Sequence, residues 1–240
     1  MKPDSNYIIN TIQKEIMAMD DLISKVSDLA LNCADSNKNS LKSDDQYQII
    51  DSKYQNKEWR KSGTWYKTGK NNECELYQKN QIKNLIGIIP EKTHDRLNMD
   101  TNEIINCKNP NTKPNGFDIT ENFDGKIING NNTIYFNYKM VCDSGGAQTR
   151  TLREVYHFIK CQIAYLIKIK QSGDHNHNNT HYYFINILDG DTSYQSMDKF
   201  TYLLEKHKQV NENIENSYLF VGSMYSLSQN ATLLQKIKNI

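Results

Sequence analysis

The chain has 240 residues, a formal net charge of +1, 37% hydrophobic residues and 10% aromatic residues. This aromatic content and balanced charge argue against a disordered chain, which usually lacks aromatic residues and carries a high net charge. No apolar run reaches the ~18–20 residues that span a bilayer, and the first residues lack the apolar stretch of a signal peptide. The five cysteines form no Cys-x-x-Cys pair, which argues against a zinc site or a disulfide framework. We therefore expect a folded, intracellular (cytoplasmic) protein without a membrane segment.

The first 70 residues are predicted to form a helical N-terminal region followed by a basic and aromatic loop. Apolar residues recur at three-to-four spacing over 5–32, the pattern of an amphipathic helix, and a polar linker follows over 33–50. Residues 53–70 then hold six Lys or Arg against one acid, together with both tryptophans. Such a segment can follow a DNA backbone, with lysines on phosphates and aromatic rings against bases. It can equally bury its tryptophans in the core.

Residues 71–240 are predicted to form one α/β domain. Its fold class is a mixed sheet with helices on both faces, because helical and strand patterns alternate along the chain. The central prediction is a hairpin, in which a strand over 117–123 and a strand over 133–141 are joined through turn dipeptides. Thr151 and Glu154 match a capping box, which predicts a helix that starts at Thr151 and runs to about 168. The other predictions are a helix over 73–86, an irregular loop over 90–116, strands over 181–188 and 217–221, and helices over 196–209 and 228–239.

Three polar residues of the predicted hairpin occupy positions that could meet at one end of the sheet. Asn137 and Lys139 are two residues apart in a strand and therefore share a face, and Asp118 lies in the partner strand. Asp118 would be a hard oxygen ligand for Mg²⁺, and Asn137 could ligate the metal or orient a metal-bound water. Lys139 would activate the attacking water and stabilise the developing charge. The set suits phosphodiester hydrolysis, although Lys139 could also face solvent on an edge strand and Asp118 could simply start a turn.

This layout resembles the PD-(D/E)xK nuclease superfamily, and within it the type II restriction endonucleases. The motif reads Gly-Phe-Asp at 116–118 and Phe-Asn-Tyr-Lys at 136–139, and the resemblance covers roughly residues 70–226. Asn137 stands where the family usually has an acid, so Mg²⁺ affinity should be weaker unless another carboxylate contributes. Glu75 is the preferred candidate because the first helix of the family often lends a carboxylate. The alternatives are Glu73, Asp124 and Asp143.

The resemblance implies a homodimer that binds duplex DNA, reads a short and probably palindromic sequence, and cleaves each strand with Mg²⁺. A companion DNA methyltransferase acting on the same sequence would fit such an enzyme. The segment after the hairpin is similar to one that reaches DNA in the family, where Gln can contact adenine and Arg can contact guanine. Helices 5–32 and 151–168 are the expected dimer or core surfaces. The residues expected to bind DNA are Ser144, Gln148, Arg150, Arg153 and Lys61.

Two other functions stay open on the sequence. The chain could be a repair or structure-specific DNA nuclease, or a non-catalytic DNA-binding protein in which Asn137 marks a lost site. The arginines after residue 148 could also be an ordinary solvated helix start, although they oppose the helix dipole there. Histidines 175, 177 and 181 could form a transition-metal site. A polar surface loop is the favoured interpretation of these histidines, because no Cys or Glu partner lies nearby.

Overall fold

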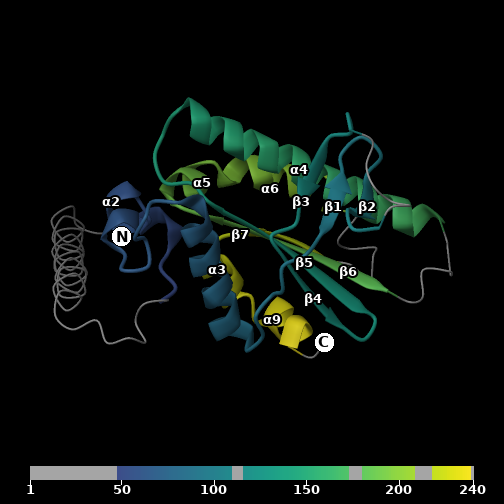
Figure 1. The fold of residues 1–240 in the computed structure, drawn as a ribbon, viewed down its shortest axis with the longest axis horizontal. Helices are drawn as coiled ribbons and strands as arrows, with labels where there is room; N and C mark the ends of the chain where they lie inside the picture. Colours follow the sequence, from purple (N-terminus) through teal and green to yellow (C-terminus); the bar gives the residue numbers. More distant parts are fainter. Residues whose placement is uncertain (1–47, 110–115, 173–179, 209–217, 239–240) are drawn as a thin grey trace, which may run out of the picture. The chain divides into compact units, whose positions relative to one another are not determined.

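The computed structural model describes residues 48–109, 116–172, 180–208 and 218–238 (Figure 1). Tyr47–Ile240 forms one compact unit. The helix predicted over 5–32, most of the linker over 33–50, and histidines 175 and 177 lie outside the described residues. The domain boundary predicted after residue 70 stays a prediction.

A four-stranded mixed sheet forms the centre of this unit, in the order β4-β5-β6-β7. β4 and β5 are antiparallel, whereas β5, β6 and β7 run parallel. Gly130, at a φ of 55°, makes the tight turn between β4 and β5, a conformation that glycine adopts without steric cost. The strands predicted over 133–141, 181–188 and 217–221 are confirmed. The strands are β4 (Gly125–Asn129), β5 (Asn132–Met140), β6 (His181–Asp189) and β7 (Tyr218–Gly222).

Helices cover both faces of the sheet, and each face has its own apolar core (Figure 1). Because strand side chains alternate between faces, Tyr135 packs into the core beneath α4 and α6, and Phe136 packs into the core beneath α3, α8 and α9. The protein is thus an α/β protein with a mixed sheet. The main helices are α3 (Asn71–Ile86), α4 (Gly146–Ser172), α6 (Met197–Lys206), α8 (Met224–Gln229) and α9 (Ala231–Lys238). Shorter elements are η2 (Ser52–Tyr54), α2 (Lys57–Ser62) and α5 (Asp191–Gln195).

A second, antiparallel sheet corrects the predicted hairpin. It has the order β2-β1-β3, with β1 (Asp95–Asn98), β2 (Glu103–Asn106) and β3 (Thr120–Asn122). The strand predicted over 117–123 shrinks to β3 and pairs with β1, so the partner of β5 is β4 instead. Phe117, which set the apolar alternation, is 96% exposed. The loop predicted over 90–116 was wrong where β1 and β2 form.

Two predicted helix boundaries were also wrong. α4 begins at Gly146 rather than at Thr151. The Thr151 hydroxyl donates to the Ala147 carbonyl one turn back, at 3.1 Å, so it does not cap the helix. The helix predicted over 228–239 is divided into α8 and α9 at Asn230, whose side chain accepts a 3.0 Å hydrogen bond from the Leu233 N–H. This is the geometry of a helix N-cap.

Candidate active site

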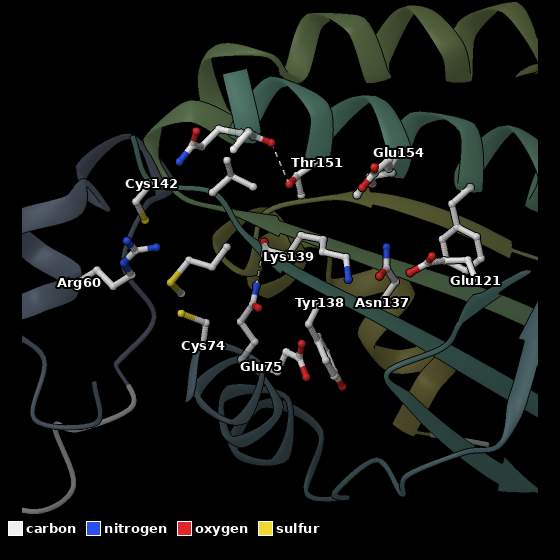
Figure 2. A pocket seen from close by; sticks show the side chains of 17 residues that line it. Arg60, Cys74, Glu75, Glu121, Asn137, Tyr138, Lys139, Cys142, Thr151 and Glu154 are labelled. Atoms are coloured by element: carbon white, nitrogen blue, oxygen red, sulfur yellow. Dashed lines mark hydrogen bonds between the residues drawn. The ribbon is translucent and has the colours of Figure 1, made fainter. Parts of the chain in front are cut away.

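A pocket of about 450 Å³ lies at the carboxyl end of β5, between α3 and α4. Figure 2 shows Glu75 rising from α3, Glu154 and Thr151 descending from α4, and Lys139 and Asn137 between them. We call this cavity the acid pocket. Its polar and charged lining residues are Arg60, Glu75, Gln78, Glu121, Asn137, Lys139, Gln148, Thr151 and Glu154.

Asp124 is the acid that the β4–β5 hairpin brings to Lys139. Gly125 pairs with Phe136 in the antiparallel register, so the residue before β4 lies beside the carboxyl-terminal half of β5. The Asp124 carboxylate accepts a 2.7 Å hydrogen bond from the Tyr138 N–H, and the same oxygen lies 3.7 Å from the Lys139 ammonium. Asp124 was one of the alternative acids in the sequence. It is not itself among the residues that line the acid pocket, but it lies beside Lys139, in the position expected of Asp118.

Asp118 lies in a different part of the fold. It precedes β3 and accepts a 3.0 Å hydrogen bond from the Asn98 side chain, which belongs to β1. It is not among the residues that line the acid pocket. The prediction that Asp118 sits in the strand next to Asn137 and Lys139 is therefore wrong, because that strand pairs within the second sheet.

Asn137 and Lys139 lie on one face of β5, as predicted, but their environments differ. Asn137 is only 1% exposed, and its amide donates to the Asn186 side chain at 3.3 Å. Asn186 is held in turn by a 2.8 Å hydrogen bond to Gln162. This anchoring leaves Asn137 Oδ1 as a buried acceptor with no hydrogen-bond partner among the described residues. Lys139 keeps about a quarter of its side chain exposed to solvent.

Three carboxyl groups share Lys139 as their nearby cation. Burial raises the pKa of Asp124, and Lys139 offsets part of that rise. Burial, with the charge of Asp124, likewise raises the pKa of Glu75. The pKa of Glu121 is raised by burial, and the charges of Asp124 and Glu154 also raise it, while Lys139 and Arg96 lower it. The prediction that Glu75 joins the site agrees with this geometry, whereas Glu121 was not anticipated.

The two other acids weighed in the sequence have different partners. The Glu73 carboxylate accepts hydrogen bonds of 2.9 and 3.1 Å from the N–H groups of Thr68 and Gly69, so it orders the turn before α3. Asp143 forms a 3.5 Å ion pair with Lys57. Neither acid lines the acid pocket.

A buried polar network fixes the floor of the pocket. Asp189, at the end of β6, is fully buried, and burial raises its pKa. It accepts hydrogen bonds from Ser52 Oγ at 3.0 Å, Gln78 Nε2 at 2.8 Å and the Met224 N–H at 2.9 Å. Gln78 Nε2 also contacts the Lys139 carbonyl at 3.3 Å. The network therefore ties β5, where Lys139 lies, to α3, where Glu75 lies.

The end of β6 needs a glycine next to this network. Gly190 has a φ of 97°, and a Cβ there would lie 2.3 Å from the Val141 carbonyl oxygen. The Gly190 N–H donates a 2.9 Å hydrogen bond to the Gln55 side chain, which is completely buried. Residues 52–55 are thus part of the site's support, although the sequence groups them with the N-terminal region.

The four residues in and just before α4 that were expected to bind DNA do not face the same cavity. Gln148 lines the acid pocket, whereas Arg153 lines a second pocket between α4 and α6. Arg150 is 80% exposed in its side chain and forms a 2.9 Å ion pair with Glu154. Ser144 is exposed just before the helix. The structure brings only Gln148 to the pocket, and DNA contact by the four residues stays a prediction.

The basic and aromatic segment packs on α3. The Trp65 ring stacks on Tyr77 at a centroid distance of 4.3 Å, and Trp59 meets Trp65 at 5.8 Å. This packing supports the interpretation that the tryptophans are structural. Lys61 is exposed and lies 3.5 Å from Glu58. Arg60, which was not singled out in the sequence, reaches the acid pocket.

The pocket can offer oxygen ligands to a metal ion without forming a closed cage. In the part of the chain that the structure describes, no three His, Cys, Asp or Glu side chains are grouped closely enough to hold one. Mg²⁺ usually takes only one or two carboxylates and completes its shell with water and substrate phosphates. Asp124, Glu75 and the unpaired Asn137 Oδ1 fit such an open site, because they supply hard oxygen donors beside buried negative charge.

Comparisons with known proteins supply no relative. Among the described residues, no helix has the length and hydropathy to cross a membrane. No protein-family model, curated protein or solved structure gives a significant match to this chain.

Proposed function

We propose that this protein is a Mg²⁺-dependent endonuclease that hydrolyses phosphodiester bonds in duplex DNA, of the type II restriction endonuclease kind. The observation that carries the proposal is the Asp124 carboxylate beside the Lys139 ammonium, 3.7 Å apart. Asp124 immediately precedes β4, and its antiparallel partner β5 carries Lys139 and Asn137. In this proposal Asp124 takes the role first given to Asp118. The motif becomes Asp124 followed by Asn137-x-Lys139.

The order of elements supports the assignment. The family places its acid and its lysine on a hairpin, followed by a helix and a further strand. Here β4 and β5 form the hairpin, α4 follows, and β6 returns parallel to β5. α3 precedes the hairpin and brings Glu75 to the same pocket, as the first helix of the family often does.

The charge of the pocket favours a divalent cation. Burial raises the pKa of Asp124, Glu75 and Glu121, and the charge of Asp124 adds to the rise for Glu75 and Glu121. A cation bound beside them would offset this cost of ionisation, since an opposite charge within a few ångströms favours the ionised carboxylate. Mg²⁺ when bound would stabilise the negative charge that develops on the phosphate.

The residues of the chain then have distinct roles. Asp124 and Asn137 Oδ1 would hold the metal, with Glu75 as the further carboxylate. Asp124 also orients the Lys139 ammonium. From there Lys139 can donate a hydrogen bond to the attacking water or to a phosphate oxygen, and such a preorganised donor is worth roughly 10²–10³ in rate. Glu121 lines the same pocket as Asn137 and Lys139 and can accept a proton from water.

The finer features of the proposal come from the resemblance. They are cleavage at a short palindromic sequence, action as a homodimer and a companion DNA methyltransferase. A palindromic site calls for a two-fold symmetric protein, which is the reason to expect the dimer. Digestion of one plasmid separates the candidates, because discrete bands indicate a sequence-specific enzyme and a smear indicates a repair or structure-specific nuclease.

A non-catalytic DNA-binding protein is the second candidate, and one observation favours it. Asn137 is 1% exposed and bonded to Asn186, so the position usually held by a family acid carries no charge and is almost fully buried. Retained DNA binding with no Mg²⁺-dependent cleavage would select this candidate.

The test of the proposal is the Lys139→Ala variant, assayed for plasmid cleavage with Mg²⁺ and for DNA binding without it. We expect cleavage to fall by about 10³-fold, because the ammonium next to Asp124 is lost, and binding to change little. Lys83→Ala is the matched control, since Lys83 is exposed on α3 and does not line the pocket. Mg²⁺-dependent cutting by Lys139→Ala at the wild-type rate would overturn the proposal.

A further inference from the structure

A second groove, of about 580 Å³, opens on the other side of Glu75 and Asp124. It lies between α3 and the segment that leads into β1. Two lysines, one histidine and one arginine line it, together with two carboxylates, Glu75 and Asp124. Glu75 also lines the acid pocket, whereas Asp124 lines only this groove. We call it the basic groove. Its Lys, His and Arg residues are Lys79, Lys92, His94 and Arg96.

We propose that the basic groove binds the sugar–phosphate backbone of the DNA strand that is cut, next to the scissile phosphate. This inference deepens the proposed function and rests on it. It adds a binding surface outside the hairpin motif, since three of its four Lys, His and Arg residues belong to the segment 92–96, in and before the second sheet.

Several lysines outside the groove form ion pairs with carboxylates, whereas the two lysines of the groove do not. Lys126 is paired with Asp95, Lys168 with Glu103 and Lys57 with Asp143. By contrast, over the ranges that the structure describes, neither Lys79 nor Lys92 forms an ion pair. His94 likewise makes no side-chain hydrogen bond there, and Arg96 donates to the uncharged Thr120 hydroxyl at 3.2 Å. Among the described residues, the groove therefore holds two lysines and an arginine that form no ion pair, and Arg96 acts at longer range on Glu121, whose pKa it lowers.

The basic groove is continuous with the acid pocket. Glu75 and Tyr138 line both the acid pocket and the basic groove. Lys79 follows Glu75 by four residues on α3, so the two side chains share a helix face and their backbones are about 6 Å apart along the axis. A ligand bound at the Glu75 carboxylate could therefore extend into the groove and reach the Lys79 ammonium within about one helical turn.

The wall that carries the other cations is firmly held. Asp95, in β1, is buried and bonded to Lys126, to the Tyr135 hydroxyl at 2.9 Å and to Asn106 at 2.7 Å. Burial opposes ionisation of Asp95, but these bonds lower its pKa overall, so the carboxylate stays charged. β1 is therefore fixed to β4 and β5, and Arg96, the next residue, is presented to the groove from a rigid support.

A polynucleotide backbone is the ligand that suits both compartments. Its phosphates are permanently charged and regularly spaced, so one phosphate can lie at the carboxylates with the metal ion while a neighbour meets the lysines. The exposed Leu76 side chain also lines the groove and offers apolar surface for a sugar. Lysine contacts of this kind strengthen binding without reading sequence.

The test compares the double variant Lys79→Ala/Lys92→Ala with wild type in the full-length chain. Binding of a short fluorescent DNA duplex is measured by anisotropy over a salt series, with EDTA present to prevent cleavage. Each lost phosphate contact should reduce the slope of log affinity against log salt by about 1. We expect a total reduction of about 2, by the same amount for duplexes of unrelated sequence. Lys83→Ala/Lys160→Ala removes the same charge from exposed positions outside the groove and is the control.

The outcomes separate this inference from the proposed function. If the groove variant binds with the wild-type slope while wild type cleaves DNA, the inference is overturned and the nuclease stands. If the groove variant shows the reduced slope but wild type never cleaves, the groove stands and the nuclease falls. Equal slopes for the groove and control variants, absence of DNA binding by wild type, or tighter binding to an RNA duplex of the same length would each overturn the groove as a DNA site.

Discussion

Glu75 lines both the acid pocket and the basic groove, but the other charged side chains of the two cavities are mostly of opposite sign. The acid pocket gathers Glu75, Glu121 and the neighbouring Asp124 around Lys139, and the pKa values of these carboxyl groups are raised. The basic groove gathers Lys79, Lys92 and Arg96, which form no ion pair within the described part of the chain. One compartment is suited to a cation and the other to an anion. A nucleic acid that arrives with a divalent metal ion satisfies both at once, which is why we interpret the two as one binding surface.

The largest effect that separates the two compartments should come from pH. Because the pKa values of Asp124 and Glu75 are raised, these groups take up protons above the usual carboxyl range, and metal binding requires their ionised form. We expect Mg²⁺-dependent cleavage to decline on acidification while the pH is still above that range. More Mg²⁺ should move the midpoint to lower pH, because the ion competes with protons.

DNA binding in EDTA is the control for this pH profile. Lysine keeps its charge on acidification, so the basic groove should hold DNA at least as tightly at the lower pH. A cleavage midpoint that does not move with Mg²⁺ concentration would contradict the assignment of these carboxylates to the metal.

A smaller effect, on the free energy of unfolding, should come from Asp189, the buried carboxyl group in the network beneath the acid pocket. Burial raises the pKa of Asp189, so folding favours its neutral form. Its contribution to stability is therefore fully present below the pKa of the unfolded chain, and it is lost as pH rises through the higher pKa of the folded protein. Asp189→Asn cannot ionise, and Gln78 can turn its unpaired Oε1 toward the new amide.

Urea unfolding across a pH series measures this effect. We expect the stability of Asp189→Asn relative to wild type to increase steadily as pH rises from the acidic end. Asp198→Asn, on the exposed start of α6, is the control and should follow wild type. Parallel curves of stability against pH for wild type and Asp189→Asn would show that folding does not raise the pKa of Asp189, and they would contradict this prediction.

The second strand of the hairpin was predictable from sequence, whereas its partner was not. The β-branched and aromatic run over 133–141 predicts a strand by itself, and the two-residue spacing of Asn137 and Lys139 places them on one face. The partner depends on which of two neighbouring extended segments pairs with this strand. The Asn-Gly turn at 129–130 favours the segment immediately before it. The apolar alternation over 117–123 favoured the more distant segment and led to Asp118.

Other parts of the site depend on contacts far apart in the chain. Gln78 and Asp189 meet across 111 residues, and nothing in the local pattern around either one indicates that they are buried together. The Asp-Gly pair at 189–190 is typical of an exposed turn, yet Gly190 is there because the Val141 carbonyl leaves no room for a Cβ. Glu121 lies in the short polar strand β3, and short polar strands give weak signals. The basic groove likewise forms where α3 and the distant segment 92–96 line the same cavity.

The most direct measurement of the central claim compares Asp124→Asn with Asp118→Asn in plasmid cleavage with Mg²⁺. Both variants lose one carboxylate, but only Asp124 lies beside Lys139. We expect Asp124→Asn to lose cleavage by about 10³-fold, with DNA binding in EDTA retained, and Asp118→Asn to cut as wild type does. Loss of cleavage in Asp118→Asn with full activity in Asp124→Asn would contradict the account and restore the hairpin first expected from the sequence.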